Sequence, residues 1–407
     1  MMRISTSMIY DFNVAAMNQQ QARVLQTQEQ LATGTRLLNP SIDPAASVQA
    51  LDLTQADATN TQYTANRVSA KNTLTQMDTT LQSVTSVLQS IRTEMITAGN
   101  GSLSNSSRQG IATNLNGQLQ QLVSLANSTD GTGNYLFSGF QTGTQPIANT
   151  AAGYAYLGDD GQKMTQVSSN LQIGATQSGA EIFMRVKNGN GTFVTQAAAG
   201  NTGSGIATQG SVTNPALLTG NSYNVAFTVA AGVTTYSVTN TTTGLPVAGM
   251  TNQPFTSGQA ISFDGMQFTI QGAPANGDQF TVAPSSNVSI FKTVADLVTA
   301  LNTPITSGNT AQSAAMSASV SNAINNLDRS MTNVSTANAA VGSNLQVIDS
   351  TQTTGDNLGV TYKSSLSQLQ DTNFTQAATD LAQQQLALQA AQKSFAQVSN
   401  LSLFTYL

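Results

Sequence analysis

The sequence contains no histidine, no cysteine and no tryptophan, and only 8% of its 407 residues are charged. The missing side chains exclude imidazole bases, thiol nucleophiles, disulfide frameworks and the usual zinc sites. Most familiar enzyme mechanisms are excluded with them. We therefore predict that the protein is not an enzyme and has no catalytic, cofactor-binding or metal-binding residues.

Positive charge is also scarce, with 14 basic against 19 acidic residues and a formal net charge of −5. The chain therefore lacks the positive field that attracts nucleic acids or anionic lipids. No apolar run is long enough to cross a bilayer, and the opening MMRISTSMIYDFNVAAMNQQQ lacks the pattern of a secretory signal. We expect a soluble chain without nucleic-acid partners or membrane insertion, either cytosolic or exported without a cleaved signal peptide.

Proline and glycine, both poor helix formers, are concentrated in the middle of the chain. Seven of the nine prolines lie between Pro146 and Pro304, whereas residues 1–33 and 360–407 contain neither proline nor glycine. This distribution predicts an α+β protein, with a long antiparallel coiled-coil helical bundle formed by the N- and C-terminal segments and a β-rich domain inserted in the middle. The expected parts are an N-terminal assembly arm (1–45), the N-terminal half of the bundle with an aromatic hairpin (46–150), a β-rich insert (151–285), the C-terminal half of the bundle (286–360) and a C-terminal assembly helix (361–407).

Two heptad seams predict the bundle. Asp43 followed by Pro44 is a typical helix start and Gly99 a typical C-cap, so one helix of about 80 Å can run between them. Its apolar residues alternate spacings of three and four at Leu74, Met77, Leu81, Val84, Leu88, Ile91 and Met95. A second seam keeps this period at Val320, Ile324, Leu327, Met331, Val334, Val341, Leu345 and Ile348. We expect the two seams to pack on each other.

A third apolar stripe consists of Ile111, Leu115, Leu119, Leu122 and Leu125. With the two seams it predicts an antiparallel bundle of about three helices. Asn338 is the polar exception in the second seam, and it either fixes the register or marks a turn where the seam faces solvent. Helical spacing returns after the insert at Phe291, Val294, Val298 and Leu301.

The two ends of the chain carry thinner apolar stripes. Burial of so little apolar surface, at about 25 cal/mol per Å², cannot offset a conformational entropy cost of about 1–2 kcal/mol per residue. We therefore expect both arms to become helical only against a partner. The assembly residues predicted in this way are Met17, Val24, Leu31, Leu381, Leu388, Phe395 and Val398.

The middle of the chain changes to the period of two that is typical of strands. Apolar residues alternate with polar or small ones in residues 223–229 and 236–238. Phe263 and Met266 flank an Asp264-Gly265 pair, which predicts a hairpin with a two-residue turn. A further strand is expected at Phe280 and Val282.

The acidic residues of the middle segment are the densest candidates for chemistry. Asp159 with Asp160, and separately Asp278, occur in Gly-rich sequence. A carboxylate pair could serve acid–base chemistry or weak Ca²⁺ binding, but no ligand spacing of the EF-hand kind follows. The Gly-rich run at residues 187–191 lacks the helix and the Lys-Ser/Thr of a phosphate loop. We interpret all of these segments as turns.

Three aromatic residues, Tyr135, Phe137 and Phe140, lie in the run GNYLFSGF at residues 133–140. Two interpretations are open. The run can form a β-hairpin docked on the bundle, or it can be a contact surface for a neighbouring subunit.

Five segments in order resemble a known family. They are MRISTSMIYD, LATGTRLLNPSIDPAAS, GNYLFSGFQTGTQPI, FDGMQFTIQGAPANGDQFTV with SIFKTVADLVTAL, and ALQAAQKSFAQVSNLSLF. Together they are similar to the bacterial flagellar hook-filament junction proteins, hook-associated protein 3, in the flagellin-like superfamily. The loop ATGTRLLNPSIDPAA is also similar to one in flagellin, whereas GNYLFSGF and the LSLF end favour the junction family.

This resemblance implies a structural, extracellular subunit of the flagellum that is exported unfolded by the type III apparatus and joins hook to filament. Its partners would be hook-side and filament-side axial proteins, further copies of itself in a ring, and an export chaperone on the C-terminal helix, residues 374–403. The paired terminal helices would form an inner tube wall and the insert would face outward. The absence of cysteine and arms that cannot fold alone agree with such export.

Two other functions remain open at this point. The nearest is flagellin, the filament subunit, which would polymerise without limit. The other is a surface adhesin, or an enzyme, with its activity in the β-rich insert. An adhesin would require receptor binding by the isolated insert, and a hydrolase would require carboxylates that cluster in three dimensions.

Overall fold

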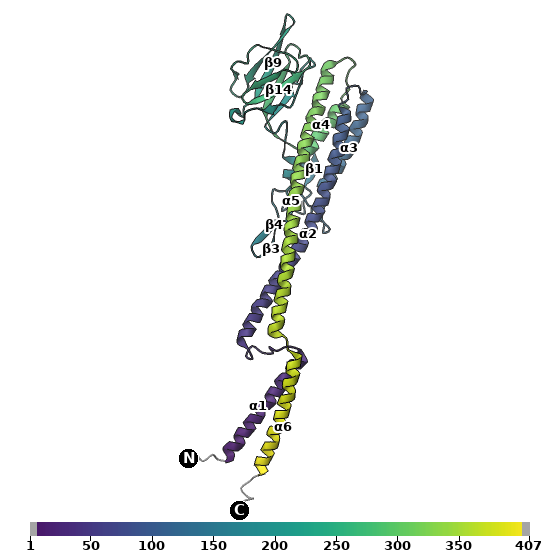
Figure 1. Cartoon of the computed structure of the whole chain (residues 1–407). Coiled ribbons are helices and arrows are strands. Elements are labelled where there is room, and N and C mark those ends of the chain that lie inside the picture. Colours follow the sequence, from purple (N-terminus) through teal and green to yellow (C-terminus); the bar gives the residue numbers. More distant parts are fainter. Residues whose placement is uncertain (1–5, 401–407) are drawn as a thin grey trace, which may run out of the picture. The chain divides into compact units, whose positions relative to one another are not determined.

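The computed structural model describes residues 6–400 and confirms an α+β fold, in which helices precede and follow a β-rich segment along the chain (Figure 1). The chain divides into two compact units. The terminal unit comprises the described parts of Met1–Asn66 and Ser350–Leu407, and the central unit is Arg67–Asp349. No helix in the described range is both long and apolar enough to span a membrane.

The terminal unit contains two helices at the ends of the chain, α1 (Thr6–Thr33) and α6 (Phe374–Asn400). They lie side by side and antiparallel, since Gln20 bonds to Gln384 and the ring of Tyr10 contacts that of Phe395 (Figure 1). Neither helix contains proline or glycine, so nothing interrupts its backbone hydrogen bonds.

The C-terminal boundary differs from the predicted one at residue 361. Helix α5 (Thr310–Gln370) continues to Gln370, and α6 begins only at Phe374. The interruption has a local cause, because the side chain of Asn373 accepts a hydrogen bond from the N–H of Gln376 at 3.2 Å and caps the new helix.

Helix α2 (Pro44–Ala98) has the predicted ends. The carboxylate of Asp43 accepts from the N–H of Ala46 at 3.0 Å, and the N–H of Gly99 donates to the carbonyl of Met95 at 3.1 Å. Both ends therefore satisfy backbone groups that a helix leaves unpaired. The helix has 55 residues, which at 1.5 Å per residue gives the expected length of about 80 Å.

In the central unit α2 packs antiparallel on α5. Lys71 pairs with Asp349 at 2.6 Å and Arg92 with Asp328 at 2.7 Å, so the two helices keep one register between these points. All seven seam residues that we predicted on α2 are fully buried. On α5 five of the eight are buried, and the half-buried ones are Ile324, Met331 and Leu345.

The polar exception in the α5 seam does not occupy a buried position. Ala337 is buried between Val334 and Val341, and Asn338 is half-buried beside it. The seam therefore continues through a small apolar residue. That Asn338 fixes the register of the two helices stays a prediction.

Two shorter helices, α3 (Asn105–Ala126) and α4 (Ile290–Asn302), complete the helical part of the central unit. The predicted bundle of about three helices is thus a bundle of four, because α4 packs along α3 and its Phe291, Val294 and Leu301 are buried. Of the predicted stripe on α3, only Leu125 is half-buried and the other four residues are buried.

The chain between α3 and the large sheets folds irregularly on the helices. It forms two small hairpins and short elements, which are β1 (Ile147–Thr150), β2 (Gly153–Tyr156), β3 (Met164–Ser168), β4 (Leu171–Gly174), the π-helix η1 (Ala180–Met184) and β5 (Val186–Lys187), which pairs with β16 (Asn287–Val288). Phe137, Ile147 and Phe183 contribute to the same apolar core as the helices. The core of the bundle is therefore closed on one side by this segment.

The predicted aromatic hairpin at residues 133–140 is not a pair of regular strands. The segment consists of turns with isolated bridges, Thr129 to Tyr135 and Ser138 to Ser178. Gly133 and Gly139 have φ of 87° and 74°, and such left-handed positions interrupt an extended strand.

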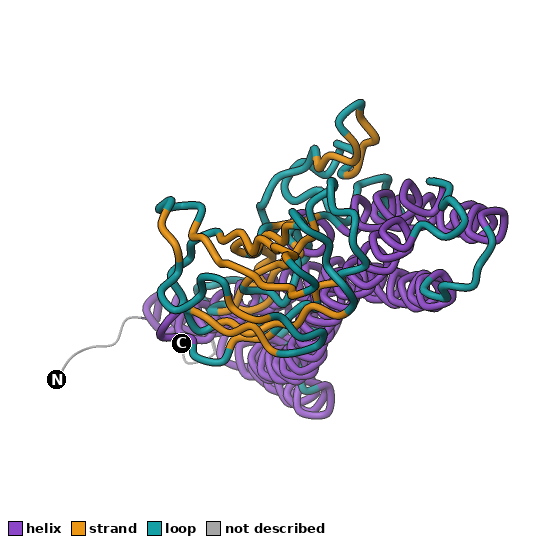
Figure 2. Tube along the Cα trace, turned by 90° about the horizontal axis from the view of Figure 1, so that it is seen from above, coloured by secondary structure: helices purple, strands orange, loops and turns teal. Residues whose placement is uncertain are grey.

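Two antiparallel sheets form the outer β-rich part, which is seen beside the helices in Figure 2. One sheet has the order β11-β10-β9-β15-β6, with β12 also on β10, and the other has β13-β14-β7, with β8 on β14. Their strands are β6 (Phe193–Ala197), β7 (Ile206–Ala207), β8 (Ser211–Val212), β9 (Tyr223–Ala230), β10 (Val233–Asn240), β11 (Leu245–Pro246), β12 (Gln253–Pro254), β13 (Ala260–Phe263), β14 (Met266–Gln271) and β15 (Gln279–Pro284). A short 3-10 turn, η2 (Pro215–Leu217), precedes β9.

The β-rich part has an apolar core of its own. Tyr223, Val225 and Phe227 of β9 are buried in it, as the period of two predicted. The predicted hairpin at Phe263 and Met266 is confirmed, and Asp264 and Gly265 adopt φ of 44° and 76°, as a two-residue type I′ turn requires.

We predict that Ile91→Ala lowers the free energy of unfolding of the central unit by about 2–5 kcal/mol, because it leaves a cavity in the fully buried seam. Ile96→Ala is the matched control on the same helix, where the side chain is 53% exposed, and it should cost no more than about 0.5 kcal/mol. Urea denaturation of both variants measures the difference. Equal effects would show that the seam does not dominate the stability of this unit.

Candidate functional site

The acidic turn at Asp159 was the first candidate for chemistry. Its carboxylate accepts hydrogen bonds from the backbone N–H groups of Phe140 at 2.9 Å, Gln141 at 3.1 Å and Gly161 at 2.7 Å. These bonds, above all the one from Phe140, lower the pKa of Asp159. The carboxylate therefore joins the aromatic turn to the loop after β2 and stays ionised.

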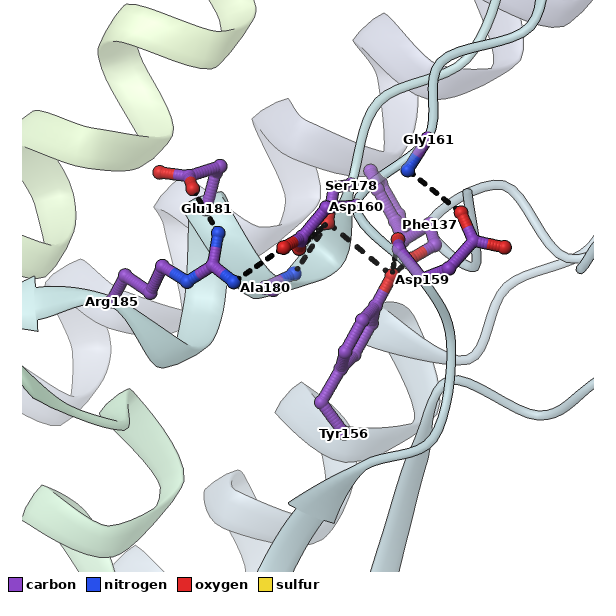
Figure 3. Close-up of polar contacts among 9 residues, drawn as sticks. All are labelled: Phe137, Tyr156, Asp159, Asp160, Gly161, Ser178, Ala180, Glu181 and Arg185. Atoms are coloured by element: carbon purple, nitrogen blue, oxygen red, sulfur yellow. Dashed lines mark hydrogen bonds and ion pairs between the residues drawn. The ribbon is translucent and has the colours of Figure 1, made fainter. Parts of the chain in front are cut away.

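Asp160 and Tyr156 lie beside this turn and are also engaged (Figure 3). Arg185 contacts Asp160 at 2.6 Å, and its hydrogen bond lowers the pKa of that carboxyl group. The hydroxyl of Tyr156 lies 2.9 Å from the carbonyl of Phe137 and 2.8 Å from that of Asp159, and burial raises its pKa. Asp159, Asp160 and Tyr156 therefore use their polar atoms in contacts that hold neighbouring loops together.

Asp278 of the outer β-rich part, like Asp159, accepts hydrogen bonds from backbone N–H groups of nearby loops. It is buried and accepts from the N–H groups of Thr202 at 2.8 Å, Gly203 at 3.1 Å and Ala275 at 2.8 Å. Across residues 6–400, no group of three or more acidic side chains is placed to hold a metal ion. The interpretation of Asp278 as a turn residue agrees with these contacts.

The Gly-rich run at residues 187–191 is a turn fastened to α5. The guanidinium of Arg329 donates from Nε to the carbonyl of Gly189 at 2.7 Å, and Asn326 accepts from the N–H of Gly189 at 3.3 Å. The backbone groups that a phosphate loop would present to a ligand are used within the chain here.

The three aromatic residues of the 133–140 segment have different surroundings. Phe137 is fully buried and contacts Phe183 edge-on at 5.4 Å between ring centroids, and Tyr135 is half-buried. Phe140 is 66% exposed, although its backbone is fixed by Asp159. Of the three, only Phe140 presents a large apolar surface to a neighbouring subunit.

The predicted assembly residues of the two arms lie on faces that α1 and α6 turn toward each other. Val24 is buried and Met17 and Leu31 are half-buried, next to Thr27, whose hydroxyl bonds to Oε1 of Gln384 at 3.0 Å. On α6 the half-buried residues are Leu381, Leu388 and Phe395. The side chain of Val398 lies outside the described residues.

A second set of apolar side chains covers the outer faces of the same two helices, and sequence periodicity missed it. Its members are Met8, Phe12, Leu25 and Leu386, which are between 60% and 74% exposed. We call this set the outer apolar face. A heptad search finds one seam, so large residues off that seam were not selected. The available signal was their size within helices otherwise rich in glutamine, alanine and threonine.

The loop between α1 and α2 holds the helix ends of the terminal unit together. The N–H of Arg36 donates to the carbonyl of Gln370 at 2.6 Å and its Nη2 to that of Leu369 at 3.0 Å. The N–H of Thr372 donates to the carbonyl of Gly34 at 2.9 Å. These contacts fix where α1 and α6 start their pairing, and sequence analysis did not identify them.

Comparison with known families gives two matches. Residues 4–142 match the family described as bacterial flagellin N-terminal helical region. Residues 196–284 match the D2-like domain of flagellar hook-associated protein 1, which corresponds to the outer β-rich part.

Individual proteins and solved structures that are similar to this chain also come from the flagellum. Flagellar hook-associated protein 3 of Salmonella typhimurium is 27% identical over 403 residues, 99% of each chain. The protein of that name in Escherichia coli is 37% identical over 182 residues, which is 45% of this chain and 57% of the other. The FlgL crystal structure from Xanthomonas campestris is 32% identical, with TM-score 0.72, over 77% of this chain and 99% of that one. Hook-associated protein 3 of Legionella pneumophila is 29% identical, with TM-score 0.73, over 78% and 98%.

We predict that Gly139→Ala destabilises the central unit more than Gly133→Ala does. Both glycines have a positive φ, so alanine costs about 1–2 kcal/mol at either position. Only at Gly139 would the added Cβ overlap the carboxylate and carbonyl oxygens of Asp159, whereas the space around Gly133 is open. Thermal unfolding of the two variants should separate them, and equal melting temperatures would contradict the close packing of the turn on Asp159.

We also predict that Asp159→Asn removes a pH-dependent contribution to stability. Because the folded pKa of Asp159 is lowered, its ionised form adds stability above the unfolded pKa of about 3.9, and this stability is lost as pH falls through the folded value. Urea midpoints should favour the wild type at pH 7, with a difference that closes in acid. A difference independent of pH would contradict the assignment.

Proposed function

This chain belongs to the flagellar hook-associated protein 3 (FlgL) family, and we propose that the outer apolar face of its paired terminal helices seats it between hook-side and filament-side subunits. The family establishes it as a structural protein of the flagellar hook-filament junction. The observation that carries the proposal is the large exposed apolar surface on two helices that are already paired with each other.

The exposed side chains supply the energy of assembly. Each buried aromatic residue removes about 150–250 Å² from water, which at about 25 cal/mol per Å² favours association by several kcal/mol for each anchor. Phe12 is 74% exposed and Leu386 is 68% exposed, so little of this energy is used within the chain. Burial of these side chains against neighbouring subunits would release this energy.

The polar residues of α1 and α6 suit contacts with unlike neighbours. Their few charged residues are Asp11, Arg23, Glu29, Asp380 and Lys393, and glutamine is abundant. Uncharged amides can hydrogen-bond in several registers without the desolvation cost of burying a charge. An adaptor that meets hook subunits on one side and filament subunits on the other requires this tolerance.

The remaining partners belong to the same proposal. We expect copies of the chain to form a ring, and an export chaperone to cover the C-terminal helix before assembly. Export unfolded by the type III route, without a cleaved signal peptide, would place the protein outside the cell. The half-buried character of the α1–α6 contact supports this view, because a weakly stabilised pair is easily kept apart until assembly.

The central unit would transmit torque. Its α2–α5 seam is fully buried on the α2 side, and the loops packed on it are fastened by charge-assisted hydrogen bonds such as that of Arg185 to Asp160. Such a close-packed body deforms little under load. Family membership favours this junction role over that of the filament subunit.

We predict that Phe12→Asp and Leu386→Asp each weaken binding to isolated hooks by about 30-fold or more, as expected when an interface anchor worth at least about 2 kcal/mol is lost. Electron microscopy of hooks mixed with purified protein, together with motility of cells carrying the variants, gives the readout. Leu245→Asp is the matched control, since Leu245 is 65% exposed in the outer β-rich part.

The residues that α1 and α6 turn toward each other form an inner seam. Variants of this inner seam distinguish a loss of subunit assembly from a loss of α1–α6 pairing. Leu388→Asp and Phe395→Asp should also abolish filament attachment, but by separating α1 from α6, which makes both termini sensitive to protease in the free monomer. Phe12→Asp and Leu386→Asp should leave protease resistance and circular dichroism unchanged. Normal hook binding by both outer variants would refute the proposed surface.

A further inference from the structure

A groove of about 480 Å³ lies in the central unit. The end of α2, the beginning of α3 and the linker between α4 and α5 line it, with side chains that include Ser104, Asn105, Arg108, Thr306 and Ser317. The side chains that line the groove thus carry hydroxyl and amide groups and one positive charge, that of Arg108.

Arg108 is unusually placed for a charged residue, since only 6% of it is exposed. Its Nη1 donates to the carbonyl of Leu103 at 2.7 Å, and its Nη2 donates to Oδ1 of Asn105. Its Nε is enclosed and has no acceptor. A buried polar group without a partner is costly, and a buried donor of a cation more so.

No carboxylate within residues 6–400 forms an ion pair with Arg108. The first turn of α3 also lacks an acidic residue, although the N-terminus of a helix carries a partial positive charge. The guanidinium and the helix terminus therefore add their positive potentials in the same groove. None of the described residues that line the groove is acidic.

The linker keeps the groove in shape. Asn105 donates from Nδ2 to the carbonyl of Ile305 at 3.2 Å and accepts from the N–H of Ile305 at 3.0 Å. The side chain of Gln312 accepts from the N–H of Thr306 at 2.7 Å. These bonds hold the linker, residues 303–309, against the start of α3. The polar wall of the groove therefore needs no rearrangement to receive a ligand.

We propose that this groove binds a free oxyanion of the phosphate or carboxylate class, with Arg108 as its principal ligand. Its Nε–H is the donor without an acceptor among the described residues, and the planar fork of arginine matches two oxygens of either group. Hydroxyls of the groove, such as those of Thr306 and Ser317, complete the set of donors. This site is independent of the surface that seats the protein in the flagellum.

Titration of the full-length protein with inorganic phosphate and, separately, with acetate, at constant ionic strength, tests the proposal. Isothermal calorimetry should give saturable binding of at least one anion, and the anion that binds identifies the class. Arg108→Gln should weaken it by at least about 10-fold, the effect of losing 1.4 kcal/mol. Lys187→Gln removes an exposed positive charge of the same unit and should leave binding unchanged.

A second pair of variants covers the case in which Arg108→Gln does not fold. Ser317→Glu places a carboxylate on the wall of the groove, whereas Ser317→Gln has the same size without the charge. The glutamate variant should melt at a higher temperature than the glutamine variant and should lose anion binding. Absence of saturable binding by either anion, or equal binding by wild type and Ser317→Glu, would overturn the proposal.

Discussion

The antiparallel packing of α2 on α5 within the central unit is the interaction on which the rest of this unit depends. Its seven fully buried α2 side chains form a continuous apolar surface, and α3 and α4 add to the same core. The flanking ion pairs, Lys71 with Asp349 and Arg92 with Asp328, are more than a third exposed, so solvent screens them and they add little stability. They select the register, while apolar burial supplies the stability.

Helix α5 also holds the irregular chain that leaves the bundle. Asn344 donates to the carbonyl of Gly174 at 3.1 Å, Gln177 donates to that of Ala337 at 3.3 Å, and Arg329 donates to that of Gly189 at 2.7 Å. All three contacts are made by residues 329–344 of α5. One helix therefore provides both the apolar seam and these polar contacts. They keep the irregular chain between α3 and the large sheets in a fixed position on the bundle, although it contains few strands.

The sequence was sufficient for features set by local pattern and insufficient for those set by contacts distant in the chain. Heptads placed α2 and α5, Asp43 with Pro44 placed a helix start, and alternation placed β9. The acceptor role of Asp159 toward Phe140 connects residues 19 positions apart and leaves no periodic trace. The same reason hid Arg108, because neither its burial nor its lack of a carboxylate partner can be read from the spacing of its neighbours.

The terminal helices show how one sequence can serve both a free monomer and an assembly. Their inner seam is narrow, with Val24 buried and most of its other members only half-buried, so the pair gains limited stability from its own contact. The residues that would have widened the seam, such as Phe12 and Leu386, lie on the outer faces instead. Apolar surface that does not stabilise the monomer remains available to a neighbour, and each subunit added would complete the burial that the isolated pair lacks. Under the proposed function, limited stability of the free arms would therefore be a condition of strong attachment.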